Sequence, residues 1–231
     1  MKADVELEPH KYSSIGFHLI TSATRVQLFC AYLACIGVLI GLPYLLINNY
    51  IPRMWESDLN VEIALDSSIP FIPYSLIAYF SLYLYYPIFA YILTKDDQRP
   101  QGLEIIKYFL MMTWFSFFFF IALPTEIQLR HQLHANQFEQ FYQIMHFVDN
   151  PYNAWPSLHV SHSLFIILAS VHLKSATREI SQQTKIMLIA VWLCLVISTL
   201  TTKQHYVFDA VSGALVGWGA WKLYQRNSKI A

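Results

Sequence analysis

Six long apolar runs constrain the fold of this chain more than any other feature of its sequence. A helix that crosses a bilayer needs about 20 mostly apolar residues. Runs of roughly that kind lie at about 26–48, 69–94, 103–124, 157–173, 185–201 and 205–225. The fifth is short, and the sixth begins with His205 and Asp209, which lower its hydropathy. The sequence therefore predicts an all-α fold: a single membrane-embedded domain over residues 1–231, built as a polytopic bundle of six transmembrane helices.

The composition agrees with a polytopic membrane protein. Hydrophobic residues make up 55% of the 231 residues and charged residues only 13%, which is about half the charged fraction of an average soluble domain. The formal net charge is zero, so no overall attraction to nucleic acid is expected. Cys30, Cys35 and Cys194 all fall inside apolar runs, and we interpret them as reduced packing residues. Residues 1–25 lack the short apolar core of a cleavable signal peptide.

The basic residues predict how the bundle is oriented. With six spans, 12 of the 15 lysines and arginines lie on the side of the two termini, and the other side holds Arg53, Arg130 and Lys203. Basic residues concentrate on the cytoplasmic side of membrane proteins. We therefore expect both termini in the cytoplasm, in a plasma membrane or a bacterial inner membrane. The outer side is otherwise acidic, so the two basic residues near its histidines indicate an anion site.

A short amphipathic helix is predicted in the long loop 125–156. In "FEQFYQIMHF", Phe138, Phe141, Tyr142 and Met145 recur at positions i, i+3, i+4 and i+7, which form one helix face. Such a helix lies either in the outer membrane interface or over the bundle as an ordinary surface helix. The pattern is compatible with both.

Three polar segments are expected to meet at the outer ends of the helices: "PTEIQLRH" (124–131), "PSLHV" (156–160) and "TTKQHYVFD" (201–209). His205 and Asp209 are four residues apart and so share a helix face. A carboxylate in that position fixes the tautomer of the imidazole and leaves the other ring nitrogen as a base or nucleophile. His159 lies at the start of another helix, from which it can donate a proton to a leaving group.

The same segments offer groups that bind an anion. Arg130 and Lys203 carry positive charge, and an arginine can bind an oxyanion in a bidentate fork. Ser157 and Thr202 add hydroxyl groups, and helix starts offer free N–H groups. Together with the two histidines, these residues predict a phosphoryl-binding site. For Ser157 a simpler interpretation is also open, because Pro156–Ser157 makes an ordinary helix start with the serine as its cap.

Other residues near these segments have simple structural interpretations. His162 lies three residues beyond His159, and we interpret it as packed inside the bundle. Gly213, Gly217 and Gly219 in "SGALVGWG" are interpreted as positions where two helices pack closely.

The sequence does not predict a metal site. His131–x2–His134 and His159–x2–His162 each supply two possible ligands, but neither follows the His-Glu-x-x-His pattern. A zinc ion would need a third ligand such as His146. We therefore expect a site that works without a metal and without a cofactor.

At these residues the sequence resembles a known family. "PSLHVSHS" followed by "STLTTKQHYVFDAVSGALVG" is similar to the second and third signature motifs of the type 2 phosphatidic acid phosphatase superfamily. Its members are multi-pass lipid phosphatases and phosphotransferases, typically with six helices and no metal. The resemblance implies that His205 is a nucleophile that forms a phosphohistidine, that Asp209 orients it, and that His159 protonates the leaving oxygen. It covers residues 124–217 and otherwise rests on the number of helices.

Three positions depart from the family pattern. Leu158 replaces the usual glycine of the second motif, and Ser198–Thr199 stand where the third motif has Ser-Arg, with Lys203 as the nearest cation. The first motif, a lysine followed after six residues by Arg-Pro, is matched here only at Arg130. "PSLH" with "KQHYVFD" is more similar to the branch of inositol-phosphorylceramide synthases and sphingomyelin synthases.

The predicted function is hydrolysis of a lipid phosphate monoester or diphosphate at a site that faces the exterior, the periplasm or a lumen. An alternative is a lipid phosphotransferase that moves a phosphoryl or phospho-headgroup to a lipid alcohol. A second alternative is a non-enzymatic lipid-binding or pH-sensing membrane protein whose histidines titrate. A transporter fits less well, because every charged candidate lies at one end of the bundle. The expected partners are a lipid phosphate substrate and membrane lipids; the identity of the lipid and the oligomeric state stay open.

Overall fold

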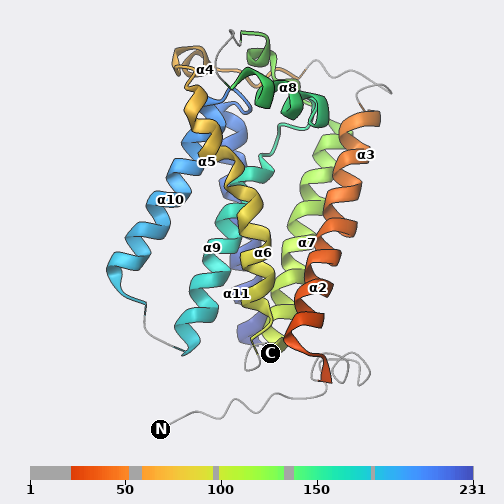
Figure 1. Ribbon diagram of the computed structural model, residues 1–231, viewed down its shortest axis with the longest axis vertical. Coiled ribbons are helices and arrows are strands. Elements are labelled where there is room, and N and C mark those ends of the chain that lie inside the picture. Colours follow the sequence, from red (N-terminus) through yellow and green to blue (C-terminus); the bar gives the residue numbers. More distant parts are fainter. Residues whose placement is uncertain (1–21, 52–58, 96–98, 133–137, 178–179, 231) are drawn as a thin grey trace.

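The computed structural model of the chain describes residues 22–51, 59–95, 99–132, 138–177 and 180–230. Within these ranges the fold is all-α, as the apolar runs predict: 80% of the structure is helical, and the only β-type pairing is an isolated bridge between Thr125 and Asn153. Figure 1 shows long helices running side by side, with α4 and α8 at one end and with the start of α2 and the end of α11 at the other.

The elements follow one another along the chain with short connections. In order they are α2 (Arg25–Ile36), the π-helical turn η2 (Gly37–Gly41), α3 (Leu42–Tyr50), α4 (Ala64–Ser68), the 3-10 turn η4 (Pro73–Ser75), α5 (Leu76–Phe80), α6 (Leu82–Leu93), α7 (Arg99–Ala122), the 3-10 turn η6 (Gln128–Gln132), α8 (Glu139–Val148), α9 (Leu158–Thr177), α10 (Gln182–Thr201) and α11 (Val207–Ile230).

The first apolar run forms one continuous helical rod that contains a π-helical turn. A capping box starts the rod, in which Gln27 N–H donates to Thr24 Oγ1 over 3.2 Å and Thr24 N–H donates to Gln27 Oε1 over 2.8 Å. The rod passes through α2, η2 and α3 without a break. In η2, the sequence "GVLIG", the N–H of Leu42 donates to the carbonyl of Gly37, a five-residue spacing. Such turns are rare and often lie near functional sites.

Proline decides where the next two helices begin. The second run was expected to start at 69, but Ile69 and Ile72 are extended because each precedes a proline, and the residue before a proline avoids the α conformation. The run therefore becomes helical only at Pro73. The third helix starts at Arg99 instead of 103, since Pro100 is tolerated in the first turn, where its missing N–H is not needed.

Among the described residues, four stretches of helix are long and apolar enough to cross a membrane: Arg25–Tyr50, Pro73–Leu93, Arg99–Ala122 and Gln182–Thr201. The other two predicted spans are helical but less apolar. They are α9, of which Leu158–Lys174 is a shorter apolar helix, and α11. Position in the bundle explains the lower hydropathy of α9. It contacts α6, α7, α10 and α11, so Ser157, Ser161, His162 and Ser163 can be fully buried in protein instead of facing lipid.

Helices α9 and α11 approach each other closely at two glycines. A Cβ atom added to Gly213 would lie 2.5 Å from the carbonyl oxygen of Ser157, and one added to Gly217 would lie 2.6 Å from that of Ser161. Both glycines are therefore packing positions, as predicted. The prediction for Gly219 was wrong, because a Cβ atom there would meet nothing within 4 Å.

Two further predictions concern surface elements. The helix expected in the 125–156 loop is α8, and it covers the bundle: Tyr142 and Met145 are buried in a cluster with Leu76 and Tyr79, while Phe141 faces outward.

Among the three cysteines, which are all free, the packing interpretation fits only one. Cys35 is partly buried, but Cys30 and Cys194 are exposed because they lie on the outer faces of α2 and α10.

We expect Gly217→Ala to lower the free energy of unfolding by about 1–3 kcal/mol, because the added methyl group forces two backbones apart. Gly219→Ala is the matched control, and it should raise the stability by up to about 1 kcal/mol through helix propensity alone. Both values can be measured by unfolding in mixed detergent micelles. Equal effects of the two substitutions would contradict the close contact.

Candidate active site

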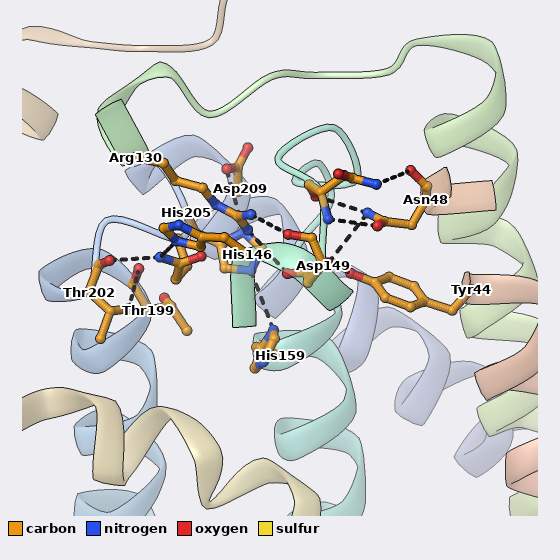
Figure 2. Close-up of polar contacts among 12 residues, drawn as sticks. Tyr44, Asn48, Arg130, His146, Asp149, His159, Thr199, Thr202, His205 and Asp209 are labelled. Carbon is orange, nitrogen blue, oxygen red and sulfur yellow. Dashed lines mark hydrogen bonds and ion pairs between the residues drawn. The ribbon is translucent and has the colours of Figure 1, made fainter. Parts of the chain in front are cut away.

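The three polar segments expected at the outer helix ends do meet, at the end of the bundle that carries α4 and α8. Backbone pairing joins the first segment to the residues just before the second: Thr125 N–H donates to Tyr152 O over 3.0 Å and Ile127 N–H donates to Pro151 O over 2.9 Å. The third joins them through Tyr206, whose hydroxyl accepts from Gln128 N–H over 3.1 Å. Figure 2 shows the resulting group of side chains, which comes from α3, η6, α8, α9 and the α10–α11 turn.

A tight turn between α10 and α11 positions His205. Lys203 N–H donates to Leu200 O and Gln204 N–H donates to Thr199 O, each over 3.1 Å. These are the two hydrogen bonds of a Schellman motif, which ends a helix with one residue in the left-handed conformation. That residue is Lys203, with φ of 59°, a costly conformation for a residue with a side chain. His205 N–H also donates to Thr199 O, which fixes the imidazole just beyond the turn.

The Lys203 side chain holds this turn against α4. Its ammonium donates to the carbonyl oxygens of Asp66 over 2.9 Å and of Ile69 over 2.5 Å. Burial lowers the pKa of Lys203, while the carboxylates of Asp66 and Glu62 raise it. The Asp66 carboxylate adds a second tie, since it accepts from Val207 N–H at the start of α11 over 2.7 Å. Lys203 and Asp66 therefore join the turn to α4, and these contacts offset the energetic cost of its left-handed backbone.

Asp209 links the start of α11 to the imidazole of His205. Asp209 is completely buried, and its Oδ2 accepts from Tyr206 N–H over 2.8 Å, as a carboxylate in the first turn of a helix can. The same oxygen lies 3.6 Å from His205 Nδ1. Among the described residues, neither His205 Nδ1 nor Asp209 Oδ1 has a hydrogen-bond partner. The two side chains are therefore close, as predicted, but the predicted shared helix face was wrong, because His205 lies in the turn before α11. A carboxylate in this position favours the tautomer with the proton on Nδ1.

His159 faces the other nitrogen of His205. His205 Nε2 lies 3.5 Å from His159 Nδ1, and the two rings meet edge to face with centroids 5.5 Å apart. Tyr79 stacks on His159 at a centroid distance of 4.2 Å and fixes the plane of its ring. With Nδ1 of His205 protonated toward Asp209, its Nε2 carries the free lone pair and points to His159 (Figure 2). The two imidazoles, which can act as a nucleophile and as an acid, thus lie next to each other at hydrogen-bond distance.

Arg130 lies beside the two histidines in a buried ion pair with Asp149. Its Nη1 donates to the backbone carbonyl of Asp149 over 2.6 Å and its Nη2 donates to Asp149 Oδ2 over 3.1 Å. Both side chains are largely buried, with 7% and 19% of their surface exposed. The Nε–H group of Arg130 has no partner among the described residues, so this guanidinium keeps a donor for an anion.

Asp149 also ties the site to the first span, a connection that the sequence did not suggest. Its Oδ1 accepts from the hydroxyl of Tyr44 and, over 3.4 Å, from the amide of Asn48. Asn48 in turn accepts from Asn150 N–H over 2.7 Å and donates to Asn150 O over 2.9 Å. The one available signal was Asn48 itself, a polar residue near the end of an apolar run, where an amide needs a partner inside the protein.

The other predicted anion ligands have different contacts. Thr202 Oγ1 donates to Ser198 O over 2.6 Å, within its own helix. Ser157 caps α9, since its Oγ accepts from Val160 N–H over 3.4 Å, and its own N–H donates to Asp209 O over 3.1 Å. That these two and Lys203 bind an anion stays a prediction, and their hydrogen bonds give each a clear structural role instead.

His162, one of the possible metal ligands, has other partners. His162 is fully buried, and its two ring nitrogens lie 2.9 Å from Tyr86 Oη and from Thr113 Oγ1. It is therefore packed, as predicted. The side chain of His131 and the whole of His134 lie outside the described residues. Within the described part of the chain, no three histidine, cysteine, aspartate or glutamate side chains gather as metal ligands.

A cavity of about 360 Å³ contains the reactive groups, a volume in the range of small-molecule sites. His159, His205 and Arg130 line its polar end, and Gln204 adds an amide that lies 3.3 Å from His146 Nε2. Its other walls are mostly apolar and come from the first span and from α6. An anionic group attached to a hydrocarbon chain matches such a cavity.

Comparison with known families agrees with this geometry. A family model described as the PAP2 superfamily matches residues 55–223, and the chain therefore belongs to the PAP2 superfamily. Membership supports a function of the phosphatase or phosphotransferase type in a membrane protein. Neither the search of curated proteins nor that of solved structures returned a match.

We expect Asp149→Ala to lower the free energy of unfolding by about 3–5 kcal/mol, because it leaves the buried Arg130 without its counter-charge. Tyr44→Phe removes only one hydrogen bond and should cost about 1 kcal/mol. Combining Asp149→Leu with Arg130→Met should restore most of the loss. Unfolding in mixed micelles measures all three. If Asp149→Ala were as mild as Tyr44→Phe, the ion pair would not be an important tie.

Proposed function

We propose that the chain is a membrane-embedded phosphatase that hydrolyses a lipid phosphate monoester or diphosphate through a phosphohistidine. The observation that carries the proposal is the line Asp209–His205–His159, with separations of 3.6 and 3.5 Å. Its polar end shares a cavity with Arg130 and with apolar walls. PAP2 superfamily membership supports the same class of chemistry.

We propose a two-step reaction at these residues. His205 Nε2 attacks phosphorus, the bond from phosphorus to the leaving oxygen breaks, and that oxygen takes a proton from protonated His159. Asp209 stabilises the positive charge that develops on the His205 imidazole, and Arg130 stabilises the negative charge on the phosphoryl oxygens. Neutral His159 then takes a proton from water, whose oxygen attacks phosphorus and breaks the phosphorus–nitrogen bond. Phosphate leaves, and both histidines return to their first state.

We further propose six spans, with both termini in the cytoplasm and the site at the opposite face. Phe208, Val211, Leu215 and Trp218 support α11 as a span, because they form an exposed apolar stripe at helical spacing. The orientation is supported by the 12 basic residues on the side of the termini. A lipid phosphate in the outer leaflet presents its headgroup at the depth of such a site.

We expect the purified protein to release phosphate, in the presence of EDTA, from one member of a panel of phosphatidic acid, phosphatidylglycerol phosphate, an isoprenyl diphosphate and a phosphorylated lipid A. His205→Ala should abolish the release, since it removes the nucleophile, and His172→Ala should leave it unchanged because His172 packs on Trp221 and Tyr224 in the body of α9. Activity that survives in His205→Ala would contradict the phosphohistidine route, and a pH-sensing binding protein would release nothing.

His159 can be tested by the choice of leaving group. We expect His159→Ala to lower kcat about 10²–10⁴-fold on a lipid alcohol ester, which needs a protonated leaving oxygen. An aryl phosphate leaves without a proton, so its first step, measured in a single turnover as release of the aryl alcohol before the water step that also uses His159, should fall far less. His205→Ala should lose both activities. An equal loss of this first step on both substrates in His159→Ala would instead indicate that this histidine binds the substrate.

A phosphotransferase is the second candidate, because "PSLH" and "KQHYVFD" resemble the inositol-phosphorylceramide and sphingomyelin synthase branch. It uses the same first step and replaces water by a lipid alcohol. If the panel yields no phosphate, a phospholipid headgroup donor supplied with a lipid alcohol should then give a new phospholipid, which mass spectrometry detects. The His205→Ala variant serves as the control in this assay too.

A further inference from the structure

We infer that the π-helical turn Gly37–Gly41 forms the binding groove for the hydrocarbon chain of the substrate and limits the length of the chains that the site accepts. The inference rests on the proposed function, because it concerns the substrate of that same site. It assigns a specificity role to the first span, Arg25–Tyr50, all of which lies outside the region matched by the family model.

The first observation is continuity between the turn and the reactive groups. Gly37, Gly41 and Tyr44 line the same cavity as His159 and His205. Gly37 precedes Tyr44 by about two helical turns, or roughly 10 Å at about 1.5 Å per residue. Tyr44 donates to Asp149, which holds Arg130. A molecule whose phosphate lies at Arg130 therefore has its chain directed along this face of the first span.

The second observation is the space left by the two glycines. A Cβ atom added to Gly37 or to Gly41 would meet nothing within 4 Å, unlike at Gly213, where the glycine is needed for helix contact. Both glycines line the cavity wall, because residues four apart lie on the same helix face. Neither glycine is required there by helix packing, so their missing side chains serve to keep the groove open.

The third observation is that the cavity opens sideways toward the membrane. Leu45 on the first span and Tyr83 on α6 both line it, and they are 43% and 58% exposed. A hydrocarbon chain can therefore reach the groove from the bilayer, passing between the first span and α6, without leaving an apolar environment. The remaining walls, which include Ile36, Ile40 and Leu82, match such a chain in polarity.

The test is a chain-length comparison in Gly41→Phe and, as a milder variant, Gly37→Leu. Gly219→Phe is the matched control, because that glycine also has open space around it but does not line the cavity. The substrates are dioleoyl and dihexanoyl phosphatidic acid, with farnesyl and isopentenyl diphosphate as a second pair. Retained activity on the short member of a pair shows that a variant is folded and has an intact phosphate site.

We expect Gly41→Phe to lower kcat/KM for the long-chain member at least about tenfold while the short-chain value changes less than about twofold. Gly37→Leu should act in the same direction, and Gly219→Phe should leave the ratio of the two values unchanged. The inference would be overturned if the ratio of long-chain to short-chain kcat/KM were unchanged in Gly41→Phe and Gly37→Leu, whether both values stay the same or both fall equally. The proposed function would then stay intact. If the wild-type protein cleaves only phosphatidylglycerol phosphate or the phosphorylated lipid A, the same comparison is made with long-chain and short-chain forms of that lipid. A wild-type protein that cleaves no lipid phosphate of the panel would overturn both.

Discussion

The close contact between α9 and α11 is the constraint on which the rest of the site depends. The two backbones approach at Gly213 and Gly217, where a side chain would collide with the carbonyls of Ser157 and Ser161. At the same place Ser157 N–H donates to Asp209 O. Because α9 carries His159 and α11 follows directly on His205, this contact sets the 3.5 Å separation of the two imidazoles. A wider helix pair would leave two separate histidines.

Two carboxylates that lie outside the line Asp209–His205–His159 hold the polar groups of the site in place. Asp66 joins the α10–α11 turn to α4, and Asp149 joins Arg130 to the first span. A buried carboxylate requires several donors, and each of these two draws its donors from different elements. The loops above the bundle are thereby fixed to the helices below, which keeps Arg130 and His205 in place beside a cavity that opens to the membrane.

Local sequence patterns predicted much of this arrangement. Apolar runs located the helices, and the four-residue spacing of His205 and Asp209 predicted that their side chains lie close together, although His205 lies in the turn before α11 and not on its face. The same approach went wrong where the answer depends on a neighbour. Gly219 follows Gly217 by two residues, so it points about 200° away around the helix and misses α9. The starts at Pro73 and Arg99 also differ from the apolar runs, because proline restricts the backbone in a way that hydropathy does not record.

The sequence by itself determined an all-helical, apolar chain and the closeness of His205 to Asp209, because both features depend on residues only a few positions apart. Only the tertiary structure decided which side chains complete the site. Tyr44 and Asn48 lie 105 and 101 residues from Asp149 along the chain, and nothing in the local pattern of either segment specifies that contact. Lys203, close to His205 in sequence, is instead turned toward α4 by the left-handed turn that ends α10. Packing between distant segments thus decided which charged groups face the cavity.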